Sequence, residues 1–432
     1  MQANLEVLEG LARRLEISVP RAEVEAEVQR RLKALAKNVK VPGFRPGKAP
    51  AALVARQYAP GVRQEVLGEL LQKRFSEAVA QLGLRVAGYP RFESRPAGEG
   101  DENLVFDARF EVYPDVAMGE LGAGKIVRPV VTVADSEVDK TLAVLQKQRR
   151  SFEAVDRAAE TGDLVKFDYH ATIDGQPFPG GEGQDFTAVI GEGRLLKDFE
   201  QNLVGIKAGE TREFDLTFPA DYAAKEIAGK TAHFSVAVKE VQAPVLPAVD
   251  SAFAQALGVE DGDVEKLRAE VKANLEREVG RRVKTRLKEQ VMDLLVQSTN
   301  FDVPQSLVEM EIERLRRMTE ADMQARGLQS MKLSADMFQE QAERRVRLGL
   351  ILADIIQKQD IKAGPEQVRA LVEEQAQSYE EPEEVVHWYY QNPERMQEIE
   401  SLALEENVVA WVMGQAQVED VVTSFDELMG RA

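Results

Sequence analysis

The chain has 432 residues, no cysteine, 44% hydrophobic residues, 30% charged residues and a formal net charge of −19. This length predicts several domains, and this composition is typical of a folded globular protein rather than a disordered one. Without cysteine, disulfides, thiolate metal sites and cysteine nucleophiles are excluded. The three histidines, His170, His233 and His387, form no short-spaced pair, so we expect no metal site.

Charge is unevenly distributed along the chain. Residues 30–75, named the basic island below, contain 11 Lys or Arg and two Glu, a balance of +9 that leaves −28 for the remainder. An acidic remainder argues against a DNA-binding protein. The N-terminus carries Glu6 and Glu9 and lacks a long apolar run, so we expect no secretory signal, no membrane partner and a cytoplasmic location.

The first 114 residues mix strand and helix patterns. Leu15, Ile17 and Val19 alternate like a half-buried strand, and residues 104–112 alternate in the same way before Pro114. Two helices are expected between these strands, because apolar residues recur there at helical spacing. The residues expected to face inward are Val24, Val28, Leu32, Leu35 and Val39 in the first helix, and Val62, Val66, Leu70, Phe75, Val79 and Leu82 in the second.

Between these helices lies the sequence VPGFRPGKAP, residues 41–50, inside the basic island. Its two Pro-Gly pairs predict two tight turns, since proline presets φ and glycine accepts positive φ. The turns hold Phe44 and Arg45 between them. A phenylalanine ring is usually buried in a core and is rare in a loop that only contacts solvent. The motif therefore predicts a loop that binds a partner.

The middle of the chain changes character twice. Residues 115–149 predict a connector that runs from an extended part, VRPVVTV, into a short helix. From about 152 to 245, alternating apolar residues and ten glycines between Gly162 and Gly229 predict a small β-rich domain.

Beyond Val245 the patterns are helical. Apolar residues recur at every fourth position from Leu267 to Leu295, a spacing that winds around a helix by about 40° per step. This stripe must meet different neighbours along its length or leave part of its surface open. Further helices are expected at 306–324, 334–359, 365–379, 383–390 and 393–417.

No common motif for hydrolysis or phosphate binding is present: the sequence lacks a Walker loop, a GxSxG elbow and an HExxH pair. An enzyme of this composition must work without metal, cofactor or strong nucleophile. Rotation about an X-Pro peptide bond meets that condition, because no covalent bond breaks. A dry aromatic pocket lowers its barrier by favouring the twisted, less polar transition state.

The β-rich segment resembles the FK506-binding type of prolyl isomerase. The motifs are IDGQPF, then IGEGRLLKDFEQNLVGIKAGE, then FPADY, in family order and spacing. LKDFE and Pro179 depart from the commoner family residues. The resemblance implies a catalytic pocket with Phe199 as its floor, while Phe167 and Phe214 are expected to be core. The implied pocket residues are Tyr169, Phe178, Phe186, Leu195, Leu196, Phe199, Tyr222 and Phe234.

Across its whole length the chain resembles the bacterial trigger factor family, through VPGFRPGKAP, LEEN, VVHWYY and FDELM. The resemblance implies a multidomain α+β protein, an ATP-independent chaperone that binds the large ribosomal subunit near the nascent-chain exit, and a family link to cell division. Gly43, Phe44, Arg45 and Lys48 would contact ribosomal protein and RNA. Other implied partners are nascent and unfolded polypeptides and a homodimer off the ribosome, and no cofactor is implied.

We expect four segments: a ribosome-binding domain at 1–114, a connector at 115–149 that packs with the helical body, an isomerase domain at 150–245 and a helical chaperone domain at 246–432. Five methionines between 310 and 337 predict an adaptable surface for unfolded clients: Met310, Met318, Met323, Met331 and Met337. Two alternatives stay open here, an isomerase with a tethering helical region and a periplasmic folding factor.

Overall fold

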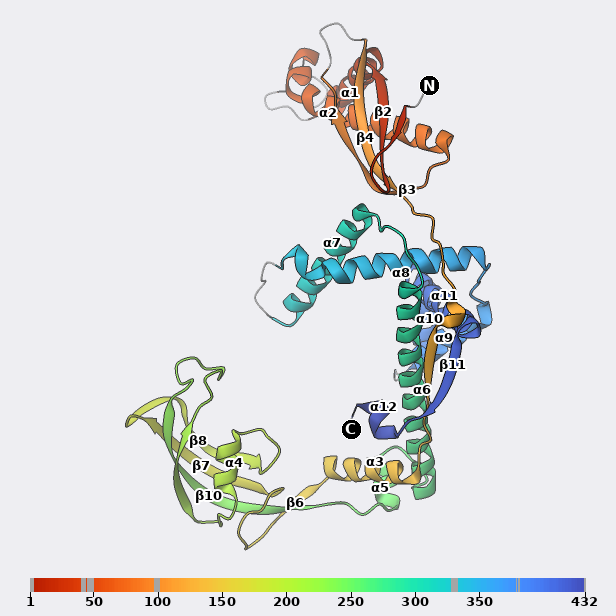
Figure 1. The fold of residues 1–432 in the computed structure, drawn as a ribbon. Coiled ribbons are helices and arrows are strands. Elements are labelled where there is room, and N and C mark those ends of the chain that lie inside the picture. Colours follow the sequence, from red (N-terminus) through yellow and green to blue (C-terminus); the bar gives the residue numbers. More distant parts are fainter. Residues whose placement is uncertain are drawn as a thin grey trace. The chain divides into compact units, whose positions relative to one another are not determined.

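The structure is a computed structural model that describes residues 4–39, 44, 50–96, 102–327, 333–377, 379 and 381–430 (Figure 1). Contacts divide the chain into two compact units. The first contains Met1–Arg128 and Lys284–Val421, and the second contains Pro129–Val283 and Val422–Ala432. Among the described residues, none of the helices combines the length and apolar character needed to cross a membrane. The protein is a multidomain α+β fold.

The first unit begins with a four-stranded antiparallel sheet. Its strand order is β1 (Leu5–Val7), β2 (Ala12–Pro20), β4 (Asn103–Val112) and β3 (Val86–Ser94). Leu15, Ile17 and Val19 are at most 4% exposed, which confirms the predicted alternation in β2. Strands β1 and β3 were not predicted. β1 is too short to show a pattern, and a register shift interrupts β3 between Ala87 and Arg91.

Helices α1 (Arg21–Asn38) and α2 (Ala51–Leu82) pack on this sheet and share its core. The predicted inward face is correct for most positions, including Val24, Val66 and Phe75. Leu82 is an exception, since it is 38% exposed. It is the last residue of α2, where Gly83 ends the helix in a left-handed conformation, so the inward face stops one turn earlier.

The helical part of the first unit agrees closely with the predicted ranges. It contains α7 (Gln305–Ala325), the 3₁₀ turn η2 (Ala335–Phe338), α8 (Gln339–Lys358), α9 (Pro365–Ala376), α10 (Pro382–Gln391) and α11 (Pro393–Gln415). A proline in the first turn begins each of the last three, where its missing N–H costs no helical hydrogen bond. The unpredicted β11 (Gln417–Val422) pairs with β5 (Lys125–Val130).

In the second unit, a five-stranded antiparallel sheet forms the predicted β-rich domain. Its order is β6 (Ser151–Ala154), β10 (Thr231–Val245), β7 (Leu164–Ile173) and β8 (Gln176–Val189), and β9 (Thr211–Thr217) also pairs with β10. The short helix α4 (Lys197–Leu203) contributes Phe199 and Leu203 to the domain's core.

The second unit also contains α3 (Asp135–Gln148), α5 (Ser251–Ala256), α12 (Phe425–Met429) and the first part of α6 (Val264–Gln297). Here the apolar stripe of α6 meets successive partners. Leu267 and Val271 lie in a core with residues of α3 and α5, and Val279 lies in another with residues of α12. Six of the eight stripe positions are buried, and Leu275 and Val283 are half-buried. The stripe is therefore mostly covered by successive neighbours, although Val271 and Leu275 also line a cavity of about 350 Å³.

Candidate active site and binding surfaces

All eight residues of the predicted pocket border one cavity of about 440 Å³ in the β-rich domain. They reach it from separate elements of the chain. Strand β7 supplies Tyr169, β8 supplies Phe178 and Phe186, and β10 supplies Phe234. The loop of residues 190–196, named the pocket loop below, supplies Leu195 and Leu196; α4 supplies Phe199, and the segment after β9 supplies Tyr222.

Phe199 lies deep in this cavity. Its side chain is 7% exposed, and its ring centroid is 5.2 Å from that of Phe214, 5.3 Å from that of Phe234 and 5.8 Å from that of Phe167. The rings of Phe214 and Phe234 meet it edge to face, an arrangement that aromatic pairs favour. Such packing fixes the orientation of Phe199, so the base of the cavity is preformed.

The rim of the cavity is more open. Phe186 and Tyr222 are 39% and 37% exposed, and the Tyr222 ring lies 4.9 Å from that of Phe218. The hydroxyl of Tyr169 donates a hydrogen bond to the carbonyl of Gly180 across 3.4 Å. The cavity therefore has a fixed apolar base and an accessible aromatic mouth.

Sequence reasoning missed several lining residues. Phe218 is the first residue of the FPADY motif, so its place beside Tyr222 in that motif could have identified it as a lining residue. Phe167, predicted to be core, is fully buried and also borders the cavity, whereas Phe214 is partly buried and does not border it. The remaining missed side chains are Pro179, Arg194, Leu216, Ala224 and Ile227.

The lining is almost free of charge. Within the described part of the chain, no Asp, Glu or His borders the cavity, and Arg194 is its one charged lining residue. A proline ring placed there would contact rings and aliphatic side chains in place of water. Such a site can bind and desolvate a prolyl imide, but its walls offer no general base.

The predicted ribosome-binding loop is only partly described. Phe44 is 43% exposed, as a residue that contacts another molecule must be. Gly43, Arg45 and Lys48 lie outside the described residues, as does Pro46.

Among the predicted client-binding methionines, three are exposed. Met310 and Met318 on α7 are 46% and 56% exposed, and Met337 in η2 is 68% exposed. On α7, Val308, Ile312 and Leu315 form the buried face instead. Met323 is half-buried, and Met331 lies outside the described residues. The three exposed methionines are therefore not gap-fillers in a closed bundle.

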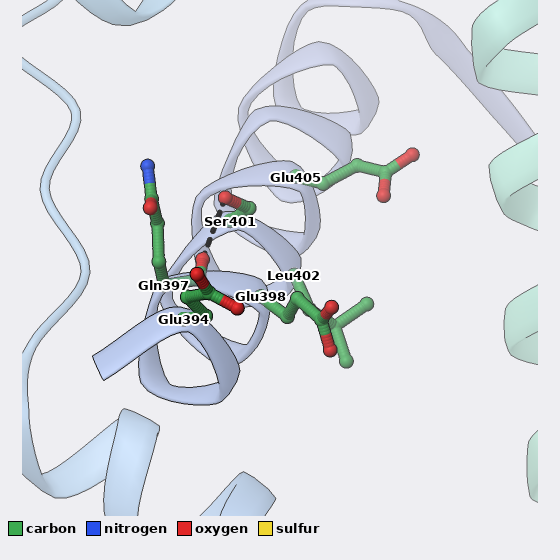
Figure 2. A pocket seen from close by; sticks show the side chains of 6 residues that line it. All are labelled: Glu394, Gln397, Glu398, Ser401, Leu402 and Glu405. Carbon is green, nitrogen blue, oxygen red and sulfur yellow. Dashed lines mark hydrogen bonds between the residues drawn. The ribbon is translucent and has the colours of Figure 1, made fainter. Parts of the chain in front are cut away.

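A further cavity of about 560 Å³ lies along α11, where three glutamates gather (Figure 2). The Ser401 hydroxyl donates to the Gln397 carbonyl across 2.7 Å, so it is used within its own helix. Glu398 pairs with Arg395 at 2.9 Å, and Glu405 pairs with Lys288 at 2.9 Å. This arrangement provides no activated nucleophile.

Comparison with known proteins covers nearly the whole chain. The family model described as "Bacterial trigger factor protein (TF)" matches residues 1–145, and the one described as "Bacterial trigger factor protein (TF) C-terminus" matches 263–414. Between them, the model described as "FKBP-type peptidyl-prolyl cis-trans isomerase" matches 155–239.

Curated relatives are similar over their full length. A protein of Thiobacillus denitrificans named "Trigger factor" is 69% identical over 432 residues, and one of Nitrosospira multiformis with the same name is 52% identical over 435 residues; each match covers 100% of both chains. A solved structure titled "Promiscuous Substrate Recognition in Folding and Assembly Activities of the Trigger Factor Chaperone" is 16% identical with a TM-score of 0.48, covering 96% of this chain and 100% of that one.

Proposed function

This chain belongs to the trigger factor family, and from that premise we propose which of its residues bind the ribosome, isomerise prolyl bonds and hold clients. It is a chaperone with a ribosome-binding N-terminal domain and an FKBP-type peptidyl-prolyl isomerase domain. The boundaries that we propose are 1–114 for ribosome binding, 115–149 for the connector, 150–245 for isomerisation and 246–432 for holding clients. We further propose a cytoplasmic location and the family's link to cell division.

The observation that carries the assignment of the catalytic site is the convergence of all eight expected residues on one aromatic cavity without an acidic or histidine side chain in its described lining. A planar X-Pro amide is stabilised by resonance, and the barrier to its rotation is about 20 kcal/mol. The twisted transition state lacks that resonance and is less polar. Surrounding the prolyl imide with rings instead of water therefore destabilises the planar state relative to the twisted one.

Phe199 supports the proline ring from below in this proposal, and Leu195 and Leu196 enclose it from the side. Tyr222 and Phe186, which are partly exposed, contact the peptide as it enters. The buried contacts of Phe199 with Phe214 and Phe234 support this division, because a floor residue must not move when the substrate binds.

For ribosome binding, the proposal assigns the contact to Gly43, Phe44, Arg45 and Lys48. The exposure of Phe44 and the +9 balance of the basic island support it. Ribosomal RNA supplies phosphates for the cations, and an apolar niche on the ribosome accepts the ring. The family can also dimerise, and a homodimer off the ribosome is part of the proposal.

Client holding is assigned to the exposed methionines of α7 and η2, away from the isomerase pocket. A competition experiment on the intact protein tests this separation. A short prolyl peptide at saturating concentration fills the pocket, and the delay of aggregation of a denatured client is measured with and without it. We expect isomerase activity toward a second peptide to disappear while the delay is unchanged. Loss of both together contradicts separate sites.

A further inference from the structure

The pocket loop, residues 190–196, is a thin wall between two cavities. Gly193 and Leu195 border the aromatic cavity, and both also border a second cavity of about 400 Å³. Glu200 borders only the second cavity. Ile190 at the start of the loop is buried in the domain's core, and the part of the loop beyond it has open space on two sides.

The backbone of this loop also contains two glycines in a conformation that other residues rarely adopt. Gly191 and Gly193 have φ angles of 93° and 71°, in the left-handed region. Glycine loses more conformational freedom than any other residue when it is ordered, and the loop contains two. Ordering the stretch from Gly191 to Leu195 therefore costs conformational entropy, which a contact to its amides would offset.

Glu200 on α4 supplies that contact. Its Oε2 accepts a hydrogen bond from the Gly191 amide at 3.0 Å, and its Oε1 accepts from the amides of Gly193 at 3.0 Å and Leu195 at 3.4 Å. The residue is only 7% exposed. A carboxylate is removed from water at a cost unless hydrogen bonds replace the lost hydration, and here three main-chain N–H groups do so.

We propose that Glu200 is a positioning residue of the isomerase, whose buried carboxylate fixes the pocket loop so that Leu195 and Leu196 close the side of the proline pocket. This inference rests on the proposed pocket. Glu200 does not touch the substrate. It follows Phe199 directly in the chain, so one short helix carries the floor and also anchors the wall.

A fixed pocket loop would keep water away from the bound prolyl imide. Catalysis by desolvation requires the wall to stay against the prolyl imide, and a small displacement of the loop admits solvent between them. The floor and wall keep a fixed separation because Phe199 is packed among rings and its neighbour Glu200 holds the loop amides.

The test replaces the carboxylate with an amide of the same shape. In Glu200→Gln the new NH₂ group cannot accept a hydrogen bond, so at least one loop amide loses its partner. Asp198→Asn is the matched control, since it makes the same charge change at an exposed position of the same helix. Both variants are measured in the full-length protein for kcat/KM on a short prolyl peptide and for amide hydrogen exchange.

We expect kcat/KM to fall about tenfold in Glu200→Gln, as the loss of a hydrogen bond to a charged group predicts. Amide exchange should become faster for Gly191, Gly193 and Leu195 and stay unchanged in β7 and β10. Asp198→Asn should match the parent protein in both measurements, and neither variant should change the delay of client aggregation.

Three results overturn the inference: normal kcat/KM in Glu200→Gln, faster exchange throughout β7 and β10, or a variant that fails to fold. The last two assign Glu200 to the stability of the whole domain instead. Phe199→Ala separates this inference from the proposed pocket. Full activity in Phe199→Ala refutes the pocket itself, whereas lost activity there with a normal Glu200→Gln refutes only the role of Glu200.

Discussion

At the scale of single residues, burial separates side chains that the sequence treats alike. Phe199 and Tyr222 were both expected in the pocket, yet one is 7% and the other 37% exposed. Phe214 touches Phe199 and lies outside the cavity lining. These differences assign distinct roles: a packed floor, an accessible rim and a supporting ring behind the floor.

Phe199→Ala should lower kcat/KM for a short prolyl peptide by at least about tenfold, because the floor of the desolvating pocket is removed. The same change leaves a void among packed rings and should cost about 3–5 kcal/mol of stability. Isomerisation kinetics and thermal melting of the full-length protein measure the two effects.

Phe214→Ala is the matched control, since it removes a ring from the same cluster without removing a cavity wall. It should lose stability in a similar way and lose less activity than Phe199→Ala, because the Phe199 ring still borders the cavity with one of its supports removed. Equal loss of activity in both variants would mean that stability, and not the pocket floor, governs the rate.

At the scale of secondary-structure elements, helices α1 and α2 are joined by ion pairs in addition to their shared core. Arg31 of α1 pairs with Glu69 of α2, and Arg74 of α2 pairs with Glu23 of α1 at 2.8 Å. Hydrogen bonds from Arg30 and Arg31 lower the pKa of Glu27 from 4.5 to about 2. Arg31 also lowers the pKa of Glu69 through a hydrogen bond.

This arrangement predicts an acid-sensitive helix pair. A carboxylate whose folded-state pKa is lowered contributes stability above its unfolded-state pKa, and that contribution is lost as pH falls through the folded-state value. For Glu27 this contribution to stability is lost as the pH falls from 4.5 to about 2. Since Glu69 is exposed and Glu27 is still partly exposed, solvent screens these pairs and we expect a modest effect.

Arg31→Met removes the partner of Glu69 and one of the two partners of Glu27, whose other partner, Arg30, remains. Helix α1 should therefore be less protected than in the parent at neutral pH, with the difference shrinking below pH 4.5. Amide exchange in α1, compared between variant and parent at each pH, measures it. Arg21→Met makes the same charge change at an exposed position of α1 and should show no such trend. A constant difference at every pH would contradict the linkage.

At the scale of the whole molecule, the cations of the basic island and the exposed methionines lie in different segments of the chain, as the proposed ribosome-binding and client-holding sites would require. The basic island has a balance of +9 in a chain of net charge −19. Exposed methionines lie instead in α7 and η2. Acidic surroundings keep an apolar client surface in solution and discourage self-association.

Replacing Phe44, Arg45 and Lys48 together with Ala should reduce co-sedimentation with ribosomes to background without unfolding the protein. The ring and two cations of the proposed contact are then missing. Binding of the parent protein should weaken as salt rises, because phosphate contacts release counterions.

Tyr89→Ala combined with Arg91→Ala is the control for this experiment. It removes an exposed ring and a nearby cation outside the basic island, where Tyr89 is 79% exposed. This pair should co-sediment like the parent. Normal ribosome binding by the triple variant would refute the assignment of the loop.

Substituting Met310, Met318 and Met337 with Ser should weaken the binding of a denatured client by at least about tenfold, since three apolar contacts are lost. The three positions are exposed, so helix content by circular dichroism should be unchanged. Substituting the same residues with Leu keeps their apolar character and should preserve the delay of aggregation. If the Ser variant holds the client as well as the parent does, the surface lies elsewhere.

The sequence by itself determined the multidomain α+β class, the long helices and eight of the residues that border the aromatic cavity. Those features depend on local periodicity or on motifs such as FPADY, which are contained in short segments. β11 shows what local patterns omit: it has no strong alternation, and it pairs with β5, in the predicted extended part of the connector, across almost 300 residues of chain.

Only the tertiary structure decided which apolar side chains are buried and which are exposed. The first part of the α6 stripe is covered by α3 and α12, which come from distant parts of the sequence, and by the neighbouring α5. Met310 and Met318 stay exposed beside the buried face of α7. The tertiary structure also showed that Glu200 faces the amides of the pocket loop. The burial of a side chain depends on which segments of the chain pack against it. Apolar residues at helical spacing show that a helix has an apolar face, but they do not show what covers that face.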